Sequence, residues 1–303
     1  MSDRELAIIG VPSSAGARSL GQERAPAALR AAGLISSLAE RGLRVVDHGD
    51  LPRVEFRPDP QHPKAQNAAL VRRVARELAA VVATTARTGA LPVVLGGDCS
   101  ITLGVVAGLL DSAASLGLVY FDADLDLNTP ATTPSGIFDG MVVAHLFGHG
   151  DPRLASLGPR RPLVEEGHLV FFGHDPVSTS VDPPELAALE RSDALRTPLD
   201  EVRTDAVAAA SAALGELERR VDRILVHFDV DVTSLPAVDV PHPQGLPLDA
   251  AAAALECFLA SPKCAGLVVT EFNPRHDADG SLARQLTGHL ARALAATVRA
   301  AGG

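Results

Sequence analysis

Short apolar runs recur along this chain, and segments with helical periodicity separate most of them. The clearest such segment is Asn67–Arg87, where apolar residues return every three or four positions. Strands that are apolar on both faces and alternate with helices are typical of a parallel sheet covered on both sides. We therefore predict one three-layer α/β/α domain over residues 1–303, with a central, mostly parallel sheet. The runs are Leu6–Val11, Leu43–Val46, Leu91–Leu95, Leu118–Phe121, Leu169–Phe172, Ile224–Phe228 and Leu267–Val269.

Two of these runs lead directly into closely spaced aspartates. Asp122, Asp124 and Asp126 follow one run, and Asp229 and Asp231 follow another. The carboxyl ends of parallel strands share one edge of the sheet, where ligands bind. Carboxylates this close repel one another in a low-dielectric cleft unless a cation neutralises them. Oxygen-rich ligand sets suit Mn²⁺, Mg²⁺ or Ca²⁺, so the pattern predicts a metal centre, although either segment alone could be a solvated acidic turn.

Three further side chains have roles that the local sequence leaves open. Cys99, in a Gly-Gly-Asp-Cys-Ser turn after an apolar run, could be a metal ligand, a nucleophile or simply a small residue. A thiolate would favour zinc or iron over manganese. Asp139 could be a general base, a substrate contact or a helix N-cap. Strand alternation places His227 on the same side as Asp229, where supporting a metal ligand is as plausible as being one.

Composition narrows the class of ligand and the location. The formal net charge of −10 argues against binding to nucleic acid or to an anionic membrane surface, and it is compatible with a small cationic ligand. The apolar runs are too short to span a bilayer, and the N-terminal residues lack a secretory signal pattern, so we expect a cytoplasmic protein. We expect the three cysteines to be reduced, because a chain of this size needs no disulfide framework.

Several segments, taken in order, resemble one enzyme family. They are Ile9–Pro12, Gly21–Leu29, Asp47–Pro52, the acidic motifs, Leu127–Pro130, Thr132–Gly136 and Glu271–Pro274. Together they are similar to the arginase and agmatinase ureohydrolases, binuclear manganese enzymes that hydrolyse guanidino compounds to urea and an amine. The resemblance covers nearly the whole chain and implies their α/β/α fold.

The resemblance assigns roles residue by residue. Metal ligands of the family match Asp122, Asp126, Asp229 and Asp231, and the guanidinium-binding glutamate matches Glu271. Asn128 and Ser135 fall in the segments that resemble the substrate loop. Asp175 lies where the family holds the substrate's α-amino group, but there the match is loose.

Three positions depart from the family pattern. Cys99 and Asp124 take the places of two histidine metal ligands, and Asp139 takes the place of a histidine used in proton transfer. We therefore expect a metal-dependent hydrolase of a guanidino or amidine C–N bond, with Asp139 and Glu271 as its catalytic residues. Two alternatives remain: a catalytically inactive family member that binds a metal or ligand, and a hydrolase of N-hydroxyguanidines.

The same departures predict unequal metal sites. One or two Mn²⁺ ions are expected, with one ion held well by Asp122, Asp124, Asp229 and Asp231. A weaker position is expected beside Cys99 and Asp126. We also expect a homo-oligomer that acts on a small cationic guanidino-type substrate.

Overall fold

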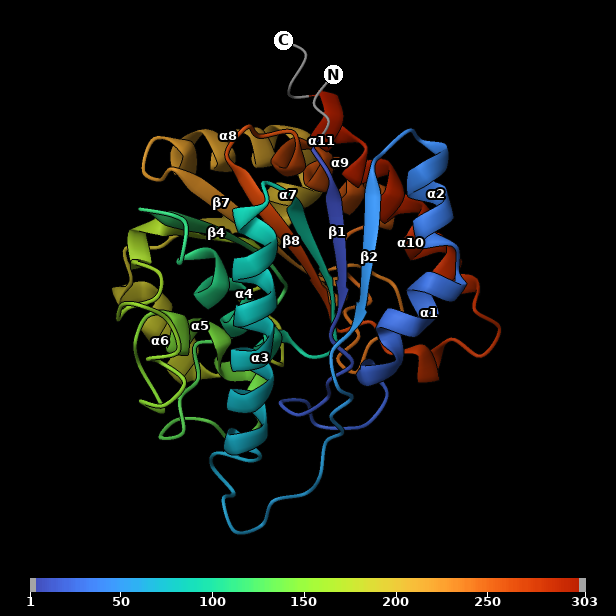
Figure 1. Cartoon of the computed structure of the whole chain (residues 1–303). Helices are drawn as coiled ribbons and strands as arrows, with labels where there is room; N and C mark the ends of the chain where they lie inside the picture. The colour runs from blue at the N-terminus through green and yellow to red at the C-terminus, as the bar shows by residue number, and fades with distance from the viewer. Residues whose placement is uncertain (1–3, 300–303) are drawn as a thin grey trace.

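A computed structural model describes residues 4–299 and contains one eight-stranded sheet in which every strand pair is parallel (Figure 1). The strand order is β2-β1-β3-β8-β7-β4-β5-β6. The predicted parallel sheet is therefore confirmed. The strands are β1 (Leu6–Gly10), β2 (Val45–Asp50), β3 (Leu91–Leu95), β4 (Leu116–Phe121), β5 (Leu169–His174), β6 (Leu195–Pro198), β7 (Arg223–Asp229) and β8 (Cys264–Thr270).

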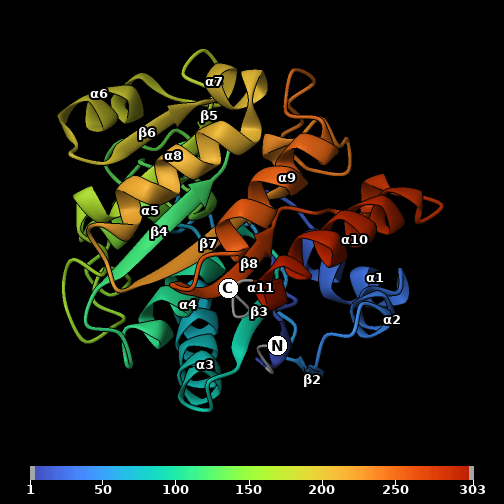
Figure 2. The same cartoon turned by 90° about the horizontal axis from the view of Figure 1, so that it is seen from above.

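Helices cover both faces of the sheet and complete the predicted three layers (Figure 2). One apolar core lies beneath α1 (Ala25–Ala31), α2 (Leu34–Glu40), α7 (Leu199–Thr204), α8 (Ala206–Glu218), α9 (Leu248–Leu259) and α10 (Ser281–Leu294). The other lies beneath α3 (Ala68–Arg87), α4 (Thr102–Leu109), α5 (Val142–Leu146) and α6 (Pro183–Arg191). A last short helix, α11, spans Ala296–Arg299. Among residues 4–299, no helix is long and apolar enough to cross a membrane.

The sequence-based strands differ from the structure mainly at the edges of the sheet. Strand β6 was not predicted, because Leu195-Arg196-Thr197-Pro198 is short and polar. Strand β2 extends past the predicted run to Asp50, and most of it is exposed. Both strands lie at an edge of the sheet, and edge strands commonly carry polar side chains. The predicted helix Asn67–Arg87 is found as α3, with Asn67 at its N-cap.

Four adjacent strands bring the predicted site residues to one edge. Strands β3, β8, β7 and β4 are consecutive neighbours in the sheet, although their order along the chain is β3, β4, β7, β8. In register, Phe121 pairs with Phe228, and Asp229 pairs with Thr270. The segments that follow these strands therefore meet at the carboxyl edge of the sheet.

Candidate metal centre

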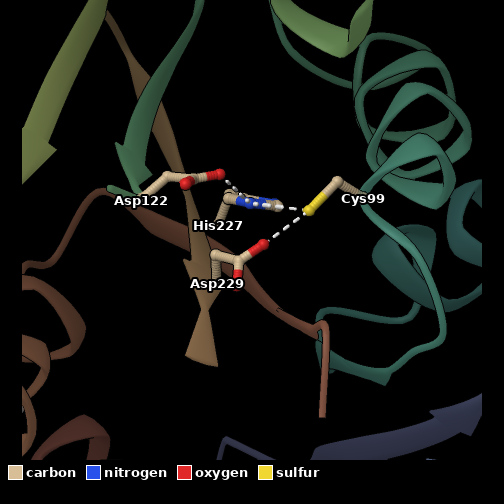
Figure 3. A group of neighbouring side chains, drawn as sticks. All are labelled: Cys99, Asp122, His227 and Asp229. Carbon is tan, nitrogen blue, oxygen red and sulfur yellow. Dashed lines mark hydrogen bonds and ion pairs between the residues drawn. The ribbon is translucent and has the colours of Figure 1, made fainter. Parts of the chain in front are cut away.

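The ends of β4 and β7 form the same small turn. The backbone N–H of Asp124 donates to Oδ1 of Asp122 at 2.7 Å, and the backbone N–H of Asp231 donates to Oδ1 of Asp229, also at 2.7 Å. Each turn uses Oδ1 of its first aspartate, and the other oxygen faces His227 in Asp122 and Cys99 in Asp229 (Figure 3). Both of these side chains are almost fully buried.

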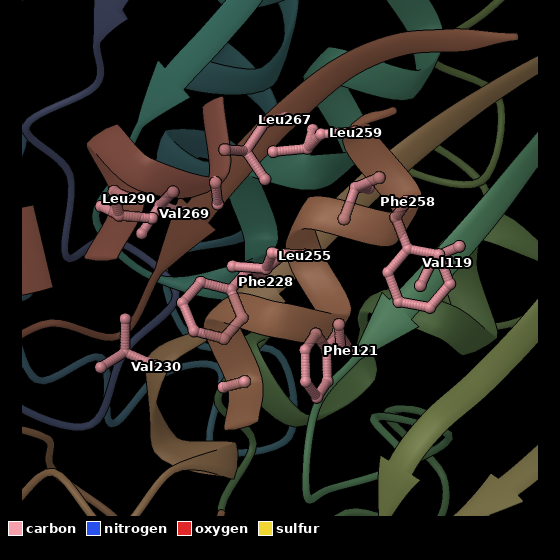
Figure 4. Packing of buried hydrophobic residues seen from close by; sticks show 14 of the residues in the cluster. Val119, Phe121, Phe228, Val230, Leu255, Phe258, Leu259, Leu267, Val269 and Leu290 are labelled. Carbon is pink, nitrogen blue, oxygen red and sulfur yellow. The ribbon is translucent and has the colours of Figure 1, made fainter. Parts of the chain in front are cut away.

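Aromatic packing beneath the sheet holds these two strand ends. Phe121 and Phe228, which directly precede Asp122 and Asp229, pack with ring centroids 5.4 Å apart. Phe121 also contacts Phe172 edge-on at 4.9 Å, and the rings of Phe121, Phe228 and Phe258 gather in one core (Figure 4). Because tightly packed aromatic rings tolerate little movement, the carboxylates one residue further on start from a rigid base.

An inner cluster, defined here as Cys99, Asp122, His227 and Asp229, lies deepest at this edge. Each residue offers one ligand atom, and these atoms all lie within 4.8 Å of one another. The Cys99 Sγ lies 2.7 Å from Asp229 Oδ2 and 3.7 Å from His227 Nε2. Oδ2 of Asp122 is buried without a hydrogen-bond partner among the described residues. The four side chains thus combine sulfur, nitrogen and oxygen donors.

The position of Cys99 depends on a close crossing of two chain segments. A Cβ on Gly97 would lie 2.0 Å from the carbonyl oxygen of Ser13, so only glycine fits there. Asp139 Oδ1 then accepts a hydrogen bond from the Cys99 backbone N–H at 2.8 Å, at the start of the 3₁₀ helix η2 (Cys99–Ile101). Asp139 does not cap its own helix, because Phe138 occupies that N-cap and no side-chain cap bond forms.

His227 is more closely integrated into the cluster than its sequence position indicates. Its Nδ1 lies 2.8 Å from Thr102 Oγ1, and its ring stacks on Tyr120 with centroids 4.2 Å apart. Burial lowers its pKa to about 3, so the imidazole is neutral. If Nδ1 donates to Thr102, the lone pair of Nε2 points toward Asp122 Oδ2, 3.7 Å away.

An outer cluster, defined here as Asp124, Asp231 and His242, lies nearer the surface, and its ligand atoms also fall within 4.8 Å of one another. His242 Nε2 is 3.9 Å from Asp124 Oδ1, and the His242 side chain is only 10% exposed. Neither His242 Nε2 nor Asp231 Oδ1 has a hydrogen-bond partner within residues 4–299. Sequence analysis missed His242, because it lies in the loop between β7 and α9 with no strand end or helical period to mark it.

Asp126, which was predicted beside Cys99, belongs to neither cluster. The Tyr120 hydroxyl donates a hydrogen bond to its Oδ2. Its backbone has a positive φ of 51°, which is uncommon for a residue other than glycine. The carboxylate still lines the cleft described below. Cys99 instead lies with Asp122, His227 and Asp229.

Glu271 follows β8 and also has a strained backbone, with φ at 65°. The Gln22 amide donates to its Oε2, whereas its Oε1 is buried without a partner among the described residues. One oxygen each of Asp139 and Glu271 lies within 4.8 Å of the Cys99 sulfur and of one another. The arrangement leaves a buried carboxylate oxygen beside the inner cluster that is free to accept from a ligand.

The electrostatics of the site call for a cation. Burial raises the pKa of Asp122 to about 7, and burial together with the charge of Asp122 raises that of Asp124 to about 6. Burial, followed by the charge of Asp229, raises the pKa of the Cys99 thiol well above its usual range. Burial is likewise the main cause of a strongly raised pKa at Asp126, Asp139, Asp229, Asp231 and Glu271. Unpaired buried oxygens and mutually repelling carboxyls fit bound divalent metal ions.

A cleft with a volume of ≈ 230 Å³ opens above both clusters. Asn128 and Ser135, predicted to bind substrate, line it, but both polar ends of Asn128 are already bonded, to Asp182 and to Thr132. Asp175 lies instead in a neighbouring recess. Arg18 is the one basic residue among the described residues that line the cleft, which is otherwise rich in carboxylates.

Known proteins share both the sequence pattern and this architecture. The model of the arginase family matches residues 4–299. The chain belongs to the arginase family. It is 32% identical to an arginase of Brevibacillus brevis over 244 residues, which are 79% of this chain and 78% of that protein. The structure of the Bacillus caldovelox arginase matches with a TM-score of 0.88 and 28% identity, over 96% of this chain and 98% of that one.

A more distant structural match extends the comparison beyond arginases. Formimidoylglutamase from Bacillus subtilis has a TM-score of 0.76 at 21% identity, over 97% of this chain and 87% of that one, and so shares the fold. Members of the arginase family are hydrolases that act on C–N bonds and typically depend on a dinuclear metal centre. The two clusters of this chain are groups of side chains that could hold metal ions.

Proposed function

We propose that this protein is a metal-dependent hydrolase of a guanidino or related amidine C–N bond. The observation that carries the proposal is the unpaired, buried Oε1 of Glu271 beside two clusters of metal-ligand side chains. A planar cationic amidine can donate two parallel hydrogen bonds to a carboxylate, and such charge-assisted pairs are the strongest in proteins. The cleft is otherwise dominated by carboxylates, which also favours a cation.

The inner and outer clusters would hold the metal, and Mn²⁺ suits the carboxylate-rich outer one. Bound divalent ions would supply neutralisation of the carboxylates and a water molecule of lowered pKa for hydrolysis. The residues of the chain do the rest. Glu271 holds the amidinium plane, and the rigid ends of β4 and β7 keep Asp122 and Asp229 in fixed positions.

Asp139 would move a proton that the reaction requires, because it lines the cleft and one of its oxygens lies near Glu271. When the water oxygen bonds to the amidine carbon, the C–N bond breaks, and the amine leaves as an ammonium ion with the two protons that the water loses. Burial, and next the charge of Asp98, raises the pKa of Asp139 well above its usual range, which favours the protonated form of its carboxyl. It can therefore act as a general acid to the amine, which leaves a urea or substituted urea as the other product.

A urea-release screen tests the proposal. Protein loaded with Mn²⁺ would be offered guanidino amino acids, guanidino amines and N-hydroxyguanidines, and a chelator-treated sample serves as the control. We expect metal-dependent release of urea, or of hydroxyurea from the N-hydroxyguanidine set. Arg18 at the cleft favours substrates that also carry a carboxylate. A metal-loaded, folded protein that hydrolyses none of them would support the inactive, ligand-binding alternative.

The N-hydroxyguanidine alternative has one observation in its favour. The sulfur of the buried Cys99 contacts the Asp229 carboxylate. The donor set of the inner cluster therefore includes sulfur as well as oxygen and nitrogen. The alternative links this donor set to a preference for a substrate whose nitrogen carries a hydroxyl. The ratio of kcat/KM for an N-hydroxyguanidine to that for its parent guanidine measures this preference directly.

A further inference from the structure

We propose that the cleft holds two chemically unlike metal positions: the inner cluster selects zinc through Cys99 and His227, and the outer cluster uses His242 as a ligand. The inference rests on the proposed function and adds detail to it. It names two histidines as ligands and different metals for the two positions.

The inner cluster has the donor set of a zinc site, and the separation of its sulfur and nitrogen is close to that of one, whereas Cys99 Sγ and Asp229 Oδ2, 2.7 Å apart, would have to separate to share an ion. An ion with Zn–S of about 2.3 Å, Zn–N of about 2.0 Å and tetrahedral angles would separate sulfur and nitrogen by about 3.5 Å. The observed separation between Cys99 Sγ and His227 Nε2 is 3.7 Å. Asp122 and Asp229 complete a set of four ligands, all of them almost fully buried.

The surroundings orient these inner donors. Thr102 Oγ1, 2.8 Å from Nδ1 of His227, and the stacked Tyr120 ring together hold the imidazole with Nε2 facing the carboxylates. Thr270 Oγ1 lies 3.2 Å from the Cys99 sulfur and donates to Asp229 at 3.4 Å. Such partners are what set the tautomer and direction of metal ligands in known sites. Nε2 of His227 lies 3.7 Å from both Asp122 Oδ2 and Cys99 Sγ, so it faces two other potential ligands of the inner cluster.

The outer cluster presents a harder donor set. Two carboxylates and one imidazole make up Asp124, Asp231 and His242, with no sulfur. The orphan Nε2 of His242 and the orphan Oδ1 of Asp231 are both buried. Burying unpaired polar atoms is costly unless a partner satisfies them, and a shared cation would satisfy both. Oxygen-rich sets of this kind suit manganese, whereas thiolate with imidazole suits zinc.

Metal titration of single variants tests the assignment. Protein stripped of metal would be titrated with Zn²⁺ and, separately, with Mn²⁺. His227→Gln and Cys99→Ser should each weaken zinc binding at least about tenfold and leave manganese binding in place, because loss of even a supporting partner costs that much. His242→Gln should weaken manganese binding and leave zinc binding in place. His149→Gln and Cys257→Ser, at an exposed histidine and a half-buried free cysteine outside both clusters, are matched controls.

Binding of cobalt to the unaltered protein tests the same assignment, and its result does not depend on whether a variant folds. One equivalent of Co²⁺ bound to the unaltered protein should show a thiolate-to-cobalt charge-transfer band and the strong visible bands of tetrahedral cobalt. Absence of the sulfur band, or unchanged binding of both metals in the two histidine variants, would overturn the inference. Urea release by a protein with two manganese ions and no sulfur band keeps the proposed function and removes this assignment. Zinc bound through sulfur without any urea release would support the metal assignment and contradict the proposed function.

Discussion

The ends of β4 and β7 have nearly the same sequence and the same turn, but their surroundings differ. Phe121-Asp122-Ala123-Asp124 and Phe228-Asp229-Val230-Asp231 lie side by side in register, and each first aspartate accepts from the backbone of the second. Oδ2 of Asp229 accepts from Cys99 and Thr270, whereas Oδ2 of Asp122 has no partner among the described residues.

This difference separates what a strand end determines from what its neighbours determine. The local sequence alone places two carboxylates at the rim and bends the chain there. Residues that come from other segments decide which donors join them: Cys99 follows β3, and His242 lies in the loop between β7 and α9. The pair of similar turns thus becomes an inner cluster with sulfur and an outer cluster without it.

The largest expected effect comes from removing a charge at either strand end. Asp122→Asn and Asp229→Asn should each abolish most metal binding at the inner cluster, because both carboxylates belong to it and an amide is a much weaker ligand. Elemental analysis after purification without chelator measures this. Asp200→Asn, at a highly exposed carboxylate on α7, is the control. Full metal content in one variant alone would show that only the other strand end carries the centre.

A smaller loss is expected at Glu271, which belongs to a third strand end. Glu271→Gln should lower kcat/KM about a hundredfold, close to 2.7 kcal/mol of transition-state stabilisation, with metal content unchanged. The unpaired Oε1 would lose its charge while the Gln22 contact at Oε2 could persist. Glu190→Gln, on an exposed position of α6, is the matched control. If metal is lost and activity per bound ion is kept, Glu271 is a ligand and not a substrate contact.

Sequence reasoning predicts the parts of this site that follow from a strand ending. The aspartates after β4 and β7, and Glu271 after β8, are signalled by apolar runs that stop at a charged residue. Alternation also places His227 on the side of Asp229, in agreement with the inner cluster. The orientation of the His227 ring toward Asp122 depends on Thr102, which comes from a different segment, and no local sequence pattern encodes that contact.

Other features arise only from long-range contacts. His242 lies between two prolines in an irregular loop, and only the folded chain brings it to Asp124. The hydrogen bond from the Cys99 backbone to Asp139 joins two distant segments, so it could not be predicted from Phe138-Asp139-Gly140 alone. The edge strand β6 was missed because a strand with a free edge does not need the apolar pattern that marks central strands.

The smallest expected effect is a pH dependence of the metal-free protein, and it distinguishes the two strand ends. Burial raises the folded-state pKa of Asp122 to about 7 and that of Asp229 well above its usual range, whereas both are near 4 when unfolded. The folded state therefore binds more protons, and stability falls as pH rises, by up to about 1.4 kcal/mol per pH unit for each group. The slope from Asp122 runs from about pH 4 to about pH 7, and Asp229 adds a slope of the same sign above about pH 4. Denaturant unfolding of chelator-treated protein should thus show that Asp122→Asn and Asp229→Asn each flatten the curve, with the effect of Asp122→Asn confined to the range between about pH 4 and 7. Identical curves for the two variants would mean that the strand ends are electrostatically equivalent despite their different neighbours.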